Sequence, residues 1–74
     1  MPKAKKRPVL AIDLGGTKIA AGLVSADGKL ISQGYCLALA NEGPEAVIKR
    51  LLSLANQTLG QAGLKTSQIA AVVI

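Results

Sequence analysis

Two short apolar runs, separated by a polar segment that contains glycine, stand near the start of the chain at 9–14 and 18–24. Both are bounded by turn-forming residues, and their length is typical of strands, so each is predicted to be a β-strand. The segment 25–28 (Ser-Ala-Asp-Gly) predicts a type I turn closed by a glycine bulge. Strand character resumes over 29–39. Three strands joined by two tight turns predict an antiparallel meander.

Side chains of the third predicted strand alternate between two faces of the sheet. We expect one face to carry Leu30, Ser32, Gly34 and Cys36, and the other to carry Ile31, Gln33, Tyr35 and Leu37.

The second half of the chain changes from a strand period to a helical period. Pro44 suits the first turn of a helix, where Glu45 favours the helix dipole. Gly63 is a stop signal, so the predicted helix covers 44–62. A loop and a final buried strand at 69–74 follow. The helix is expected to present its apolar residues to the sheet: Val47, Ile48, Leu51, Leu52, Ala55, Leu59 and Ala62.

The predicted element order is β-β-β-α-β, which makes the chain an α/β protein. A helical crossover normally returns the chain parallel to an earlier strand with right-handed sense. The first strand is the natural neighbour, because its apolar character predicts burial on both faces. The predicted mixed sheet therefore has the strand order 3-2-1-4.

Composition allows one small domain of 74 residues with a core of Leu, Ile, Val and Ala, because Tyr35 is the single aromatic residue. The chain stays apolar to Ile74. We therefore expect residues 9–74 to be an incomplete lobe of a longer protein. In isolation such a lobe is expected to associate or to fold loosely.

The net charge of +5 is concentrated at the start of the chain, where four basic residues fall within the first seven. The remaining residues carry a net charge of +1. We interpret 1–8 as a basic, disordered, solubilising tail in preference to a DNA or membrane contact. The apolar run after it is too short for a signal peptide or a membrane span.

Cys36 is the single cysteine, and the chain contains no histidine. These counts exclude an internal disulfide and a Ser/His/Asp or Cys/His catalytic arrangement built from this chain. Cys36 is expected to be a small buried hydrophobe, and a reducing, cytoplasmic location fits it.

The segment between the first two strands carries the candidate chemistry: Asp13, Gly15, Gly16, Thr17 and Lys18. Adjacent glycines allow backbone conformations closed to other residues and leave backbone N–H groups open to an anion. Thr17 adds a hydroxyl group, Lys18 a positive charge, and Asp13 a carboxylate that can hold Mg²⁺. A glycine pair between strands is equally typical of an ordinary hairpin turn. Both interpretations hold if the hairpin is itself the phosphate cradle.

Residues 9–24, with this Asp-x-Gly-Gly-Thr element, closely resemble the opening of the ROK family of bacterial sugar kinases and related repressors. The turn at 27–30 and the elements after it fall where that family places them. The resemblance implies the start of the N-terminal lobe of an actin-like ATPase, a ribonuclease H-like fold. It implies that Asp13 helps to place Mg²⁺ and that 15–18 forms the first phosphate loop for ATP.

The resemblance also implies phosphorylation of a hexose or an amino sugar by the full-length protein, glucokinase-like and expected to be a homo-oligomer. The family's catalytic base, in an Asn-Asp motif, has no match here, so no catalytic residue is assigned and the base is expected beyond Ile74. Asp27, Glu42 and Glu45 are interpreted as structural. The alternatives are a sugar-responsive ROK repressor, disfavoured because twelve residues before Asp13 cannot form a helix-turn-helix domain, or an inactive truncated remnant.

Overall fold

A computed structural model describes residues 7–74 of the chain. The strands are β1 (Val9–Leu14), β2 (Lys18–Val24), β3 (Leu30–Leu37) and β4 (Ala71–Val73), and the helix is α1 (Pro44–Gln61). Two short 3₁₀ helices, η1 (Ala40–Glu42) and η2 (Thr66–Gln68), flank α1. The order β-β-β-α-β is as predicted. Most of the tail predicted at 1–8 lies outside the described residues.

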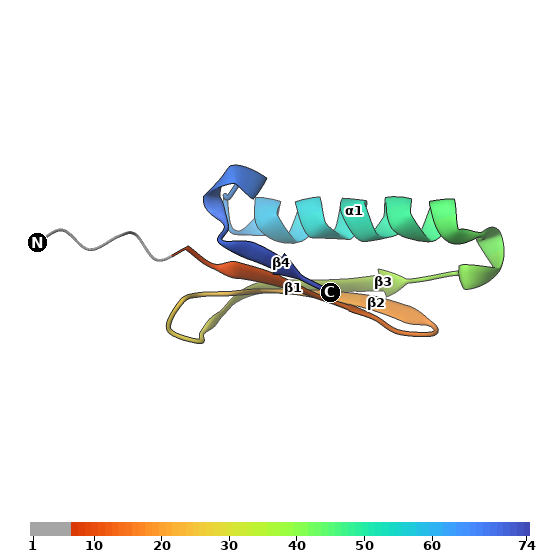
Figure 1. Ribbon diagram of the computed structural model, residues 1–74, viewed down its shortest axis with the longest axis horizontal. Coiled ribbons are helices and arrows are strands. Elements are labelled where there is room, and N and C mark those ends of the chain that lie inside the picture. Colours follow the sequence, from red (N-terminus) through yellow and green to blue (C-terminus); the bar gives the residue numbers. More distant parts are fainter. Residues whose placement is uncertain (1–6) are drawn as a thin grey trace, which may run out of the picture.

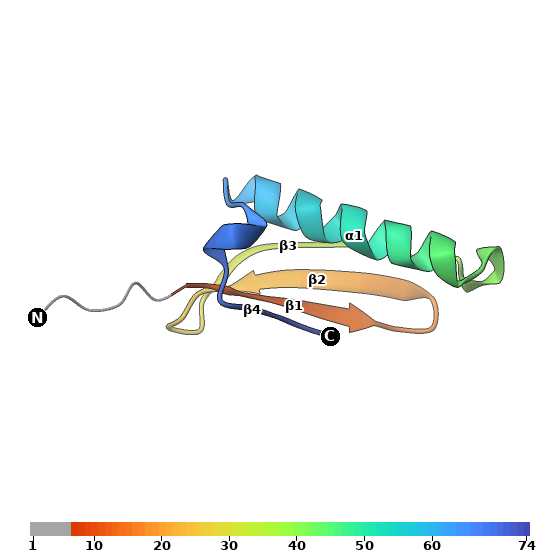
Figure 2. The ribbon, with the colours of Figure 1, turned by 45° about the horizontal axis from the view of Figure 1, so that its top comes forward.

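The four strands form one mixed sheet in the order β3-β2-β1-β4, and α1 lies across one face of it (Figures 1 and 2). β2 pairs antiparallel with both β1 and β3, whereas β4 pairs parallel with β1. The α/β class and the predicted strand order are therefore confirmed. The arrangement is the one expected for the start of an actin-like ATPase lobe.

The turn between β2 and β3 has the predicted glycine-bulge geometry. Gly28 adopts φ 90°, a conformation that is costly for residues with a Cβ atom. Its N–H donates to the Ser25 carbonyl at 2.9 Å, and the Ser25 N–H donates to the Lys29 carbonyl at 2.7 Å. The Ser25 hydroxyl also donates to the Asp27 carboxylate, which supports a structural role for that acid.

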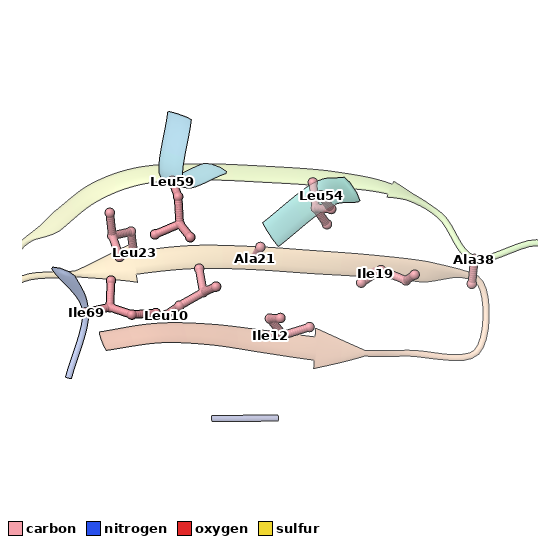
Figure 3. Close-up of a cluster of buried hydrophobic side chains, with 9 residues drawn as sticks. All are labelled: Leu10, Ile12, Ile19, Ala21, Leu23, Ala38, Leu54, Leu59 and Ile69. Atoms are coloured by element: carbon pink, nitrogen blue, oxygen red, sulfur yellow. The ribbon is translucent and has the colours of Figure 1, made fainter. Parts of the chain in front are cut away.

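The hydrophobic core lies between α1 and the face of the sheet that α1 covers (Figure 3). β2 supplies alternate residues to it, because successive strand side chains point to opposite faces. The buried apolar residues are Leu10, Ile12, Ile19, Ala21, Leu23, Ala38, Leu54, Leu59 and Ile69.

The helix turns most of its predicted apolar residues to the sheet, since Leu59 is buried and Val47, Leu51, Ala55 and Ala62 pack against the core. Two of the predicted residues instead remain exposed. Ile48 and Leu52 are each 55% exposed, whereas Leu54 and Thr58 are buried. The apolar stripe of α1 is wider than the sheet can cover, so packing rather than periodicity selects which part is buried.

Close approach of α1 to β3 explains that choice. A Cβ atom added to Gly34 would lie 3.2 Å from Leu54 Cδ1 and 3.4 Å from Thr58 Oγ1. The Ser32 hydroxyl donates to the Thr58 carbonyl at 2.7 Å, and the Thr58 hydroxyl donates to the Leu54 carbonyl at 2.8 Å. The small side chains of β3 therefore admit this part of the helix, and its polar groups are hydrogen-bonded.

No described element covers the opposite face of the sheet, which we call the open face. Ala11 is exposed there, so the predicted burial of β1 on both faces is wrong within residues 7–74. Leu30 also lies on the open face, opposite Val24, because a register shift at Leu23/Val24 interrupts the predicted alternation there, whereas the alternation from Ser32 to Leu37 is as predicted. The final strand is shorter than the predicted 69–74, because β4 covers only Ala71–Val73. All three of its residues are exposed, so the predicted burial of this strand is wrong within residues 7–74.

Gly34→Val tests the close contact between α1 and β3. The larger side chain has to displace Leu54 and Thr58, and overpacking of this kind costs about 1–3 kcal/mol. We expect the free energy of unfolding, measured by urea titration, to fall by that amount. Gln33→Val adds a similar side chain to the exposed neighbouring position and should have little effect. An unchanged urea midpoint in Gly34→Val would contradict the observed packing.

The isolated 74-residue chain is expected to self-associate through the open face, because Leu30 and Leu37 are more than half exposed there. Sedimentation velocity should show oligomers that decrease when both leucines are changed to lysine. Changing Ala26 and Ala40, which are exposed in the β2–β3 turn and at the start of η1, to lysine adds the same charge and should leave the oligomers in place. A monodisperse wild-type monomer would show that this prediction is wrong.

Candidate phosphate-binding turn

The segment between β1 and β2 is a tight hairpin turn at the end of the sheet where α1 begins (Figure 2). The Gly15 N–H donates to the Lys18 carbonyl at 2.9 Å, and the Ala38 N–H donates to the Thr17 carbonyl at 2.9 Å. Neither Gly15 nor Gly16 has a positive φ. The expectation that the glycine pair is needed for unusual backbone angles is therefore wrong here.

The two glycines have different steric surroundings. A Cβ atom on Gly15 would lie 3.2 Å from the Lys18 carbonyl oxygen, so the hairpin itself restricts this position. A Cβ atom on Gly16 would have no neighbour within 4 Å. The absence of a side chain at Gly16 therefore leaves the outer surface of the turn accessible, and it is not needed to make room inside the hairpin.

Two backbone donors at this turn have no partner among the hydrogen bonds of residues 7–74, namely the N–H groups of Gly16 and Thr17. Both residues are exposed. Exposed N–H groups on a tight turn can donate to an anion. The Gly15 N–H is not available in this way, since it already bonds the Lys18 carbonyl.

Asp13 and Lys18 lie on the open face of the sheet, beside the turn. Asp13 is opposite Ala20, and Lys18 precedes Ala20 by two residues on the same strand. The period of two places all three side chains on one face. The structure therefore brings together both charged candidate residues next to the free N–H groups of Gly16 and Thr17.

Tyr35 is a neighbour of this cluster that the sequence did not reveal. The Lys18 Nζ atom lies 5.4 Å from the centre of the Tyr35 ring. Tyr35 is opposite Ala20 in the β2–β3 register. The pairing of Lys18 with this ring could be found only after the register of both hairpins was known.

The residues present suit a magnesium–polyphosphate group. Within the described part of the chain, no cluster of three or more His, Cys, Asp or Glu residues could hold a metal ion. Mg²⁺ does not need such a cage, because it usually takes one or two carboxylates and completes its shell with water and phosphate oxygens. The exposed carboxylate of Asp13, beside Gly16 and Thr17, meets that requirement.

A separate hollow lies between α1 and β3, on the covered side of the sheet, and does not include the turn. Arg50 at its edge pairs with Glu42 and donates to the Ala38 carbonyl at 3.0 Å. The structural interpretation of Glu42 is therefore supported.

In the part of the chain that the structure describes, no helix is long and apolar enough to cross a membrane.

Comparison with known proteins relates part of the chain to sugar kinases. It is 43% identical over 51 residues to a glucokinase of Thermotoga maritima, covering 69% of this chain and 15% of the glucokinase. It is 44% identical over 45 residues to an N-acetylmannosamine kinase of Escherichia fergusonii, covering 61% and 16%. An N-acetylmannosamine kinase of Shigella flexneri is 44% identical over 46 residues. No family model matches the chain.

The chain spans only 15–16% of the length of these curated relatives. Similarity over so short a part relates this segment to sugar kinases but leaves the activity of a whole protein as a proposal.

Gly16→Ala separates a binding role of the turn from a purely structural role. The added methyl group meets no atom of the chain, so thermal stability should not fall. It projects where an anion would approach, and loss of one hydrogen bond to a charged group costs about 1.5–3 kcal/mol. We expect the affinity for Mg-ATP, measured by calorimetry, to fall by about 10- to 100-fold.

Gly60→Ala is the matched control, because Gly60 also has free space around it but lies at the far end of α1. This variant should bind Mg-ATP as the wild type does. Unaltered binding by Gly16→Ala would remove the turn as a phosphate site.

Proposed function

We propose that this chain supplies the first phosphate loop of an ATP-dependent sugar kinase of the ROK family. The observation that carries the proposal is the juxtaposition of Asp13, Lys18 and the free N–H groups of Gly16 and Thr17 at one hairpin. Partial similarity to a glucokinase and to N-acetylmannosamine kinases supports it. The substrate is accordingly a hexose or an amino sugar.

Each residue of the turn has a distinct task in this proposal. The N–H groups of Gly16 and Thr17 donate to phosphate oxygens, while Gly15 closes the hairpin behind them. The Thr17 hydroxyl and the Lys18 ammonium add a donor and a positive charge. Asp13 would hold Mg²⁺, directly or through water. When bound, Mg²⁺ neutralises charge on the transferring phosphoryl group.

These residues bind and orient the nucleotide; none of them deprotonates the sugar. Phosphoryl transfer depends mainly on positioning and on stabilising charge, so a rigid donor array at the phosphates is a large part of catalysis. The sugar site and the base belong to other parts of the proposed kinase. Residues 9–74 form part of its N-terminal lobe, and the kinase is proposed to be a cytoplasmic homo-oligomer.

Asp13→Ala tests the proposal in the complete protein that contains this segment. Removing the carboxylate should lower ATP-dependent phosphorylation of glucose or N-acetylmannosamine by about 10²-fold or more, judging from other charge-positioning groups. Thermal stability should change little, because Asp13 is exposed. Asp27→Ala removes an acid from the turn at the other end of β2 and should keep full turnover. Normal turnover in Asp13→Ala would refute the assignment.

Deletion of residues 1–7 tests the alternative of a DNA-binding repressor. If the tail only solubilises the protein, the deletion should leave sugar phosphorylation unchanged. A duplex probe that the intact protein retains at physiological salt, and that the deletion releases, would instead favour DNA binding, since phosphate contacts weaken steeply with salt.

A further inference from the structure

The Lys18–Tyr35 contact is the one cation–π pair found among residues 7–74. An ammonium group within about 6 Å of a ring centre is attracted by the ring face, and the Lys18 Nζ lies 5.4 Å from the centre of Tyr35. The register explains the contact. Leu37 is directly opposite Lys18, and Tyr35 is opposite Ala20, so Tyr35 is a diagonal neighbour of Lys18 on the same face.

Lys18 has a second diagonal neighbour, the negatively charged Asp13. Asp13 is opposite Ala20 on the β1 side, so Asp13, Ala20 and Tyr35 form one row across three strands. Lys18 can therefore turn toward the carboxylate or toward the ring. Within the described residues the one ion pair joins Arg50 and Glu42, so Lys18 is not paired with Asp13.

A Lys18–Asp13 pair would oppose the function proposed above. An ammonium group on the carboxylate competes with a divalent cation for the same oxygens and neutralises the charge that attracts the cation. Exposed ion pairs of this kind are worth about as little as an exposed cation–π contact. One aromatic ring is therefore sufficient to change where the Lys18 ammonium resides.

We propose that Tyr35 is a positioning residue that holds the Lys18 ammonium away from Asp13 and leaves the carboxylate open to hydrated Mg²⁺. This inference rests on the proposed phosphate site but concerns a residue outside the glycine turn. Tyr35 acts through its ring face and not through its hydroxyl group. Phenylalanine should therefore replace it, whereas leucine should not.

The first test is spectroscopic and needs no nucleotide. The complete protein is labelled with ¹³C at the lysine ε carbons, and the Lys18 resonance is assigned with Lys18→Met. The Tyr35 ring current should displace this resonance in the wild type and in Tyr35→Phe, and the displacement should vanish in Tyr35→Leu. Tyr35 is 73% exposed, so all three proteins should fold. An unchanged resonance in Tyr35→Leu would overturn the inference.

The second test measures Mg-ATP binding by calorimetry. Tyr35→Leu should weaken it by about two- to fivefold, the equivalent of one exposed cation–π contact, and Tyr35→Phe should not. In a Lys18→Met background Tyr35→Leu should have no further effect, because the ring then has no ammonium to hold. Unaltered affinity in Tyr35→Leu overturns the positioning role.

Asp13→Ala in the same assay separates that failure from a failure of the proposed function. If Asp13→Ala weakens binding and Tyr35→Leu does not, the proposed phosphate site stands and only the role of Tyr35 is refuted. Normal binding in Asp13→Ala removes the site itself, and the inference about Tyr35 falls with it.

Discussion

The alternation of side chains along β2 is the constraint on which the rest of the structure depends. β2 is paired on both edges, so its register fixes the faces of β1 and β3 as well. Ile19, Ala21 and Leu23 turn toward α1 and are buried, while Lys18 and Ala20 turn to the open face. Because the side chains alternate with a period of two, a register slip of one residue would turn the core residues to the open face and the charged cluster toward α1. Burial of the core therefore holds the candidate chemistry in place.

The strand order was predictable because it follows from short-range signals: two tight turns and one helical crossover allow few topologies. The limits of the buried side of α1 were not predictable in the same way. Ile48 and Leu52 have the same helical spacing as the buried residues, and the sequence does not rank them. The decision rests with Gly34 on β3, whose missing Cβ admits Leu54 and Thr58. That complementarity joins residues 20 or more positions apart and exists only after folding.

The candidate site shows a similar division. Asp13, Gly16, Thr17 and Lys18 are neighbours in sequence, so their convergence could be predicted from one short motif. Tyr35 comes to Lys18 through the register of a different hairpin, and single-sequence reasoning had no signal for it. The glycine pair misled in another way. A glycine pair usually indicates backbone angles that other residues avoid. Here the relevant property is that Gly16 has no side chain to cover the turn.

The position of the turn is set by tertiary contacts more than by its own residues. The Thr17 carbonyl accepts from the N–H of Ala38, and the Ala38 carbonyl accepts from Arg50 on α1. Ala38 is buried between these two bonds. A binding array gains from such anchoring, because donors that are already fixed lose less entropy when they meet an anion. The core that stabilises the segment therefore also holds Gly16 and Thr17 at the surface. Their own backbone preferences are not needed to fix this position.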